Sequence, residues 1–189
     1  MIVILLGAPG VGKGTQAAAA AESQGYTHLS TGELLRQEVA AGSELGKSAD
    51  TFMSRGDLVP DDIMVKMVAE CIADFPSDQV LLLDGFPRTI SQATALEEAC
   101  TSGTIGLSLY FKAPKTVLTN RLLSRGRQDD TLEIITHRLS VYAEITEPLV
   151  KHYADQGSLR EIDSDRAVDD IQKDVLFTVN GALNQSNLA

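Results

Sequence analysis

Short apolar runs alternate with helical patterns along the chain. The runs typical of strands are residues 2–6, 28–30, 80–84, 107–111 and 159–162. Helical periodicity follows at about 13–24, 31–41, 43–54, 61–74, 89–100, 114–125, 131–156 and 166–180. Unbroken apolar strands are typical of a parallel sheet that helices bury on both faces. The pattern predicts a three-layer α/β fold, with a parallel sheet of about five strands flanked by helices.

Residues that start and stop helices agree with this pattern. Asp61 and Asp62 suit a helix start, Pro114 a first turn and Gly126 a stop. The stretch RLLSRGRQDDT, residues 121–131, gathers three arginines and two aspartates around Gly126. One interpretation is a helix end, in which the arginines complement the helix dipole and the aspartates open the next helix.

Composition narrows the class of protein. A chain of 189 residues without a repeat or a Pro/Ser-rich linker suits one domain. Its net charge of −10 argues against a nucleic-acid-binding face. No apolar run is long enough to span a membrane, and no basic leader precedes an apolar segment, so we expect a cytoplasmic protein.

Cysteines and histidines carry no recognisable chemistry. Cys71 and Cys100 form no C-x-x-C pair, so a structural zinc site is not expected. Cys71 lies among apolar neighbours, which predicts a buried core thiol. The three histidines are scattered, and none is assigned a role. Of the 16 lysines and arginines, seven fall in the motifs described below, namely Lys13, Arg36, Arg88, Arg121, Arg125, Arg127 and Arg138.

A phosphate-binding loop follows the first predicted strand. The stretch GAPGVGKGT, residues 7–15, fits G-x-x-x-x-G-K between a strand and a helix. Its glycines allow the backbone to wrap around phosphates, and the helix that follows begins with unpaired N–H groups. Lys13 supplies a charge for the β- and γ-phosphates. A structural glycine-rich turn would need neither the lysine nor this context.

Position 14 departs from the general motif, because it is Gly where many such loops place the Ser or Thr that binds Mg²⁺. Thr15 comes one residue later. The sequence therefore predicts no direct protein ligand and a metal held mostly by water and by the nucleotide phosphates. Asp84, at the end of the strand 80–84, is the candidate carboxylate behind those waters.

A second anion site follows Asp84 in the stretch GFPRT. Gly85 permits close approach of the backbone, Pro87 stiffens the turn, and Arg88 is presented at the ligand-binding edge of the sheet. A cation at a helix start faces the positive end of the helix dipole, so an anionic ligand explains Arg88 better than solvation does. Gln92 follows one helical turn later.

These motifs together resemble the nucleoside monophosphate kinases, and the adenylate kinases in particular. The resemblance rests on GAPGVGKGT (7–15), LSTGELLR (29–36), GDLVPD (56–61), LLLDGFPRT (81–89), the arginine cluster and EITEPLV (144–150), in that order. It implies reversible, Mg²⁺-dependent phosphoryl transfer from ATP to AMP, which gives two ADP and maintains the adenine nucleotide balance.

The resemblance also implies roles for individual residues. Those implied to bind ATP are Gly10, Val11, Gly12, Lys13, Gly14, Thr15, Arg125 and Arg166. Those implied to bind AMP are Thr31, Arg36, Asp57, Leu58, Val59, Gly85, Phe86, Pro87, Arg88, Gln92, Arg127 and Arg138. Thr31 also suits a helix N-cap. A glutamine amide such as that of Gln92 has both a donor and an acceptor for the adenine edge.

The arginine cluster has an explanation in this reaction. The phosphate of AMP is already ionised near neutral pH, so no general base is needed. The demand is for cations that align two nucleotides and screen their charge. The residues implied to act in catalysis are Lys13, Arg88, Arg121, Arg125, Arg127, Arg138 and Asp84. Asp129 and Asp130 would orient the arginines and also cap the next helix.

The implied architecture is a single P-loop kinase domain over residues 1–189. Within it, residues 30–59 would form an NMP-binding segment and residues 125–131 a short lid. Many adenylate kinases carry a lid insertion of tens of residues, which this chain lacks. Compared with the short-lid form, it also lacks a few residues between Gly126 and Arg127. Nothing in the sequence indicates an interface, so a monomer is expected, with ATP, AMP and ADP as partners and no nucleic acid or membrane.

Three alternatives stay open at this stage. The first is a kinase for UMP or CMP, against which Thr31 and Gln92 argue, because relatives that take pyrimidines tend to carry Ala at the Thr31 position. The second is a GTP-dependent switch, which needs a guanine-reading N-K-x-D segment that is missing here. The third is a nucleotide sensor without catalysis, against which the complete arginine set argues.

Overall fold

The sheet is central, parallel and five-stranded. The computed structural model describes residues 1–73, 75–100, 104–127 and 129–186. Its strands are β1 (Ile2–Leu6), β2 (Thr27–Ser30), β3 (Leu81–Asp84), β4 (Ile105–Lys112) and β5 (Leu159–Asp163). They pair in the order β2-β3-β1-β4-β5, and every pair is parallel. The predicted sheet is therefore confirmed.

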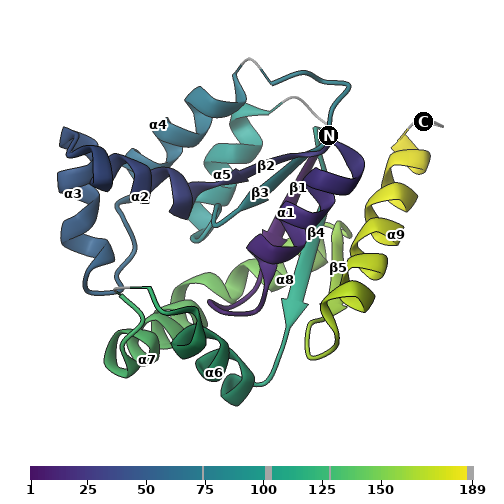
Figure 1. Cartoon of the computed structure of the whole chain (residues 1–189). Coiled ribbons are helices and arrows are strands. Elements are labelled where there is room, and N and C mark those ends of the chain that lie inside the picture. Colours follow the sequence, from purple (N-terminus) through teal and green to yellow (C-terminus); the bar gives the residue numbers. More distant parts are fainter. Residues whose placement is uncertain (74, 101–103, 128, 187–189) are drawn as a thin grey trace.

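Helices cover both faces of the sheet (Figure 1). They are α1 (Lys13–Gln24), α2 (Thr31–Ala41), α3 (Glu44–Met53), α4 (Asp61–Ile72), α5 (Ile90–Ala99), α6 (Lys115–Arg125), α7 (Leu132–Val141), a π-helix η1 (Tyr142–Thr146), α8 (Pro148–Asp155) and α9 (Val168–Ser186). Val3 and Leu5 pack in one core cluster with α1, α6, α7 and α9, whereas Ile2 and Ile4 pack in a second with α2, α4, α5 and α8. This alternation in β1 produces the three predicted layers.

The predicted helix over 131–156 is the largest difference from the sequence pattern. It is divided into α7, η1 and α8, with Pro148 as the first residue of α8. Proline has no N–H to donate four residues back, and its ring collides with the carbonyl there. The chain accommodates it by widening one turn, in which the N–H of Glu147 donates to the carbonyl of Tyr142 at 2.8 Å. At the other helices the predicted boundaries differ by a few residues, and residue 74 lies outside the described residues.

The expectation for Cys71 was wrong, because this cysteine is exposed. The buried positions of α4 are Met64 and Val68. In the last turn it is Ile72, the next residue, that packs against the core cluster, so Cys71 is left at the solvent side. Both cysteines are free thiols. Among the described residues, no helix has the length and apolar character needed to cross a membrane.

Chain topology gathers the predicted functional segments at one edge of the sheet. Leu5 in β1 and Ser30 in β2 both pair with Asp84 in β3, so these three strands end side by side. The loop after β1 leads to α1, the chain after β2 enters α2, and the turn after β3 leads to α5. Helices α6 and α7 flank the predicted lid and pack against each other.

Candidate active site

The phosphate loop lies between β1 and α1, as the motif predicts. Gly12 precedes the first helical residue with φ 105°, a conformation that side chains disfavour. A Cβ at Gly7 would lie 2.6 Å from the carbonyl oxygen of Phe111, so only glycine fits there. No side chain caps the N-terminus of α1, and its first turn contains no acidic residue. The N–H groups at this end are thus available to an anion.

The side chain of Lys13 folds back along the phosphate loop. Its Nζ donates to the carbonyl of Gly7 at 2.7 Å and to that of Ala8 at 3.3 Å. Burial lowers the pKa of Lys13 to about 8, with the charge of Asp84 opposing this shift and nearby arginines adding to it. An ammonium group held away from water among other cations favours an anionic partner.

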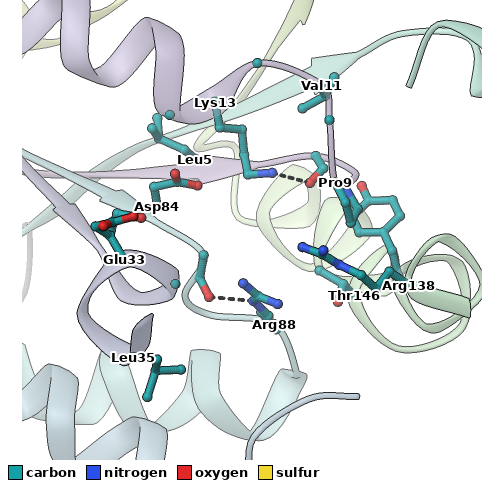
Figure 2. A pocket seen from close by; sticks show the side chains of 18 of the residues that line it. Leu5, Pro9, Val11, Lys13, Glu33, Leu35, Asp84, Arg88, Arg138 and Thr146 are labelled. Carbon is teal, nitrogen blue, oxygen red and sulfur yellow. Dashed lines mark hydrogen bonds between the residues drawn. The ribbon is translucent and has the colours of Figure 1, made fainter. Parts of the chain in front are cut away.

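Asp84 faces Lys13 across the cavity (Figure 2). Burial alone would raise its pKa, but the imidazole of His28 and the charges of Lys13 and Arg88 outweigh burial and lower it. A Cβ at Gly14 would lie 3.3 Å from Oδ2 of Asp84. The glycine that departs from the general motif thus leaves room for this carboxylate.

The donor set around Asp84 fits a water-held Mg²⁺ ion. No group of three or more acidic, histidine or cysteine side chains among the described residues forms a ready metal cage. One carboxylate beside a phosphate loop is a sufficient protein contribution for Mg²⁺, which retains several waters and binds phosphate oxygens.

Two aspartates between α6 and α7 hold one arginine from each of these helices. Arg125 donates from Nε and Nη2 to Asp130 at 2.9 and 2.7 Å, and Arg138 donates to Asp129 at 2.8 Å. The side chain of Asp130 is fully buried. These pairs confirm that the aspartates orient arginines. They do not cap α7, however, because that N-cap is Thr131, whose hydroxyl accepts from the N–H of Ile134.

Three arginines of the cavity have no carboxylate partner within the part of the chain that the structure describes: Arg88, Arg121 and Arg127. Nε of Arg88 donates to the carbonyl of Gly85 at 2.8 Å, and Nη2 of Arg121 donates to that of Ser164 at 2.9 Å. Burial, followed by the charge of Arg138, lowers the pKa of Arg88. Partly buried cations without carboxylate partners indicate a site for a highly charged anion.

Most of the residues implied to bind AMP line the same cavity. Gln92 is buried and lines the cavity, while Arg36 is paired with Glu33 at 2.9 Å. Thr31 is fully buried and donates to the carbonyl of Asp84 at 3.3 Å. It does not serve as the N-cap of α2, which is Ser30.

The cavity measures about 800 Å³ and brings together most of the predicted site residues. It is lined by Gly10, Val11, Gly12, Lys13, Gly14, Thr15, Arg36, Asp57, Leu58, Val59, Asp84, Gly85, Pro87, Arg88, Gln92, Arg121, Arg125, Arg127 and Arg138. Three predicted residues are not part of this lining: Thr31, Phe86 and Arg166. The guanidinium of Arg166 instead pairs with Asp174 and, at 3.7 Å, with Asp163. Gln128, within the predicted lid, lies outside the described residues.

Sequence reasoning missed His28 and Asp61. Nε2 of His28 lies 3.7 Å from Oδ2 of Asp84. Asp61 accepts hydrogen bonds from Thr89 and Gln92. His28 precedes the LSTGELLR motif directly, which was a usable signal. Asp61 was predicted only as a helix start, and nothing in its local sequence indicated the contact with Gln92.

The phosphate loop, the parallel sheet and the converging cations define a P-loop protein that handles nucleoside phosphates. Comparison with known proteins narrows this class. The sequence model of the adenylate kinase family matches residues 5–158.

Among similar curated proteins is an adenylate kinase of Prochlorococcus marinus (strain MIT 9211), 47% identical over 184 residues, which covers 96% of this chain and 96% of the relative. An adenylate kinase of Synechococcus sp. (strain CC9902) is 45% identical over 89% of this chain and 93% of its own. An adenylate kinase of Mycobacteroides abscessus is 44% identical over 90% of this chain and 94% of its own. The chain belongs to the adenylate kinase family. Its activity is accordingly that of a nucleoside monophosphate kinase, an ATP:AMP phosphotransferase.

Proposed function

We propose that the cavity holds ATP and AMP together, with their phosphates meeting between the phosphate loop and the lid arginines. One observation carries this proposal: Lys13, Arg88 and Arg138 converge on one space from different elements (Figure 2). Repulsion among so many cations is unfavourable, and the two sets of phosphates would relieve it.

On the ATP side, residues 10–15 would cradle the phosphates with backbone N–H groups, and Lys13 would contact the β- and γ-phosphates. Arg121 and Arg125 line the same cavity and would contact these phosphates. Arg166 was expected at the adenine of ATP, but its side chain is paired elsewhere. Val168 and Ile171 line the cavity near this loop and are the better candidates for that contact.

On the AMP side, Arg88 and Gly85 would hold the phosphate and Gln92 the adenine edge. The backbone of Asp57–Val59 and the side chain of Arg36 would close over the nucleotide from the segment 30–59. The guanidinium of Arg36 reaches AMP only if it shares or leaves Glu33. Thr31 would act through the carbonyl of Asp84, which it holds.

We propose Mg²⁺ as the cofactor, held by Asp84 through water and by the phosphates of the nucleotide. When bound, the ion neutralises charge on the phosphates. Asp84 is suited to this role because its pKa is lowered, despite burial, by His28, Lys13 and Arg88. A carboxylate that remains ionised in the cavity accepts hydrogen bonds from the metal's waters.

Phosphoryl transfer then needs no proton donor or acceptor from the chain. An oxygen of the AMP phosphate forms a bond to the γ-phosphorus of ATP, and the bond to the departing ADP oxygen breaks. Arg127 and Arg138 line the cavity and would contact the transferred group as its charge spreads. Their contribution is to align the two nucleotides and stabilise that charge.

We further propose one P-loop kinase domain, in which residues 30–59 bind AMP and residues 125–131 act as a short lid, working as a monomer in the cytoplasm. The proposed contacts to both nucleotides come from a single chain. Two free cysteines are usual for a reducing compartment.

A nucleotide panel tests the proposed function. With ATP and Mg²⁺, AMP is expected to give ADP with a kcat/KM at least about 10²-fold higher than UMP, CMP or GMP, because an amide site discriminates strongly between base edges. The measurement is coupled detection of ADP, repeated with Mg²⁺ removed by a chelator, where turnover is expected to vanish. Comparable kcat/KM for CMP and AMP would instead support a pyrimidine monophosphate kinase. Binding without turnover would support a sensor.

The lowered pKa of Lys13 predicts how ATP use depends on pH. Lys13 is charged below about pH 8 in the free protein and loses its proton above it. Because kcat/KM reports the free enzyme, kcat/KM for ATP should fall about tenfold per pH unit above that value. Bound phosphates favour the charged lysine, so kcat at saturating ATP should stay constant up to a higher pH than kcat/KM does.

Steady-state rates from about pH 7 to about pH 9.5 measure this effect. Lys13→Arg is the control, because arginine stays protonated throughout and the fall should disappear. A wild-type profile for kcat/KM that is flat across this range would show that Lys13 keeps its charge in the free protein.

A further inference from the structure

A closed ring of hydrogen bonds surrounds the amide of Gln92. Nε2 of Gln92 donates to Oδ1 of Asp61 at 2.7 Å, and Oε1 accepts from the backbone N–H of Arg88 at 2.7 Å. The hydroxyl of Thr89 accepts from the N–H of Gln92 at 3.1 Å and donates to Oδ2 of Asp61 at 2.8 Å. The ring ties the first residue of α4 to the N-terminus of α5.

The direction of every bond in this ring is fixed by chemistry. A backbone N–H only donates, so the group that faces Arg88 must be the oxygen of the amide. An ionised carboxylate only accepts, so the group that faces Asp61 must be the amide nitrogen. The opposite orientation of Gln92 would place two donors together at Arg88 and two acceptors together at Asp61. The amide is therefore held in one orientation from both ends.

This orientation decides which base edge the amide can bind. An amide has two N–H donors and two acceptor lone pairs, and the ring uses one of each. One N–H and one lone pair remain on a side chain that lines the cavity. Adenine has an acceptor at N1 and a donor at N6, whereas hypoxanthine and guanine have a donor at N1 and an acceptor at O6. A rotated amide would suit those bases equally well.

We propose that Asp61 is a positioning residue that sets the base specificity of the acceptor site by fixing the amide orientation of Gln92. The inference rests on the proposed function, in which Gln92 contacts the base of AMP. Asp61 acts through Gln92 and need not touch the nucleotide. Discrimination against hypoxanthine and guanine, the bases with O6, is thereby determined by the carboxylate of Asp61 as well as by Gln92 itself.

Asp61→Asn tests the proposal without a change of shape. The hydroxyl of Thr89 can donate to the oxygen of the new amide or accept from its NH₂ group, so the new amide can present either group to Gln92. The strict requirement for an N–H at this end is thereby lost, and only the N–H of Arg88 still opposes rotation. Because a mismatched buried polar pair is worth roughly a factor of ten or more, the ratio of kcat/KM for AMP to that for inosine monophosphate should fall at least about tenfold.

Inosine monophosphate is the informative probe, because it has the size of AMP and the reversed pattern of donor and acceptor. Asp62→Asn is the matched control: Asp62 is the next residue in the same helical turn, is exposed, and is expected to leave the ratio unchanged. Thermal melts verify folding, and Asp61→Ala, which removes the acceptor and offers no amide in its place, carries the same expectation.

The outcomes separate this inference from the proposed function. A lower ratio in Asp61→Asn, beside an unchanged Asp62→Asn, supports it. Folded Asp61→Asn and Asp61→Ala proteins that both keep the wild-type ratio overturn it, even if both nucleotides are used more slowly, because Asp61 is then only structural. A wild-type protein that does not phosphorylate AMP overturns the proposed function, and the inference with it.

Discussion

Replacing Arg88 with alanine is expected to lower kcat/KM for AMP by about 10³-fold, the scale on which single arginines act in phosphoryl transfer. The side chain of Arg88 is partly buried and has no carboxylate partner among the described residues, and its Nε donates to the carbonyl of Gly85. Its remaining N–H groups are therefore oriented for a phosphate before any ligand arrives. Arg88→Lys should recover only part of the loss, because an ammonium cannot form the two parallel bonds of a guanidinium.

Steady-state kinetics beside a thermal melt and calorimetric titration of ATP measure this prediction. The melting temperature of the ligand-free protein should not fall, because the substitution removes a buried charge near Arg138. ATP binding should change little. Arg160→Ala is the control, since Arg160 is exposed and its guanidinium donates to the carbonyls of Gly157 and Leu159. A loss of activity that accompanies unfolding would return Arg88 to a structural role.

Most of the fold could be predicted from the sequence because its signals are local. Apolar runs bounded by turns locate the strands, and Gly126 ends α6 with φ 70° as predicted. The break in the helix over 131–156 was missed because apolar periodicity continues across Pro148. Cys71 was misjudged because apolar neighbours do not show which of two adjacent residues faces the core, and here it is Ile72 that does.

The candidate site was predictable to the extent that its residues stand in motifs. Lys13, Arg88 and the lid arginines reach one cavity because the strand ends bring their loops together. Contacts between elements were not predictable in the same way. The contact of Asp61 with Gln92 spans 31 residues, and the pairing of Arg166 with Asp174 depends on how β5 leads into α9.

Arg127 is the residue of the stretch RLLSRGRQDDT for which the helix-end and the lid interpretations differ most. It lies beyond Gly126, the C-cap of α6, so it contributes little to that helix. Its backbone N–H donates to Asp130 at 3.2 Å, which positions the residue, whereas its guanidinium has no carboxylate partner among the described residues. Arg125, by contrast, is bound to Asp130 through two hydrogen bonds. Of the two, Arg127 is the one whose side chain is available to incoming phosphates.

Arg127→Ala is accordingly expected to lower kcat by at least about 10²-fold and to leave the melting temperature nearly unchanged. ATP binding should weaken far less than kcat falls, because the guanidinium contacts the phosphates most fully when charge develops during transfer. Arg127→Lys should rescue the loss only in part. Steady-state ADP formation, a thermal melt and calorimetric ATP binding measure the three effects, with Arg160→Ala again as the control. A variant with normal kcat and a lower melting temperature would restore the helix-end interpretation.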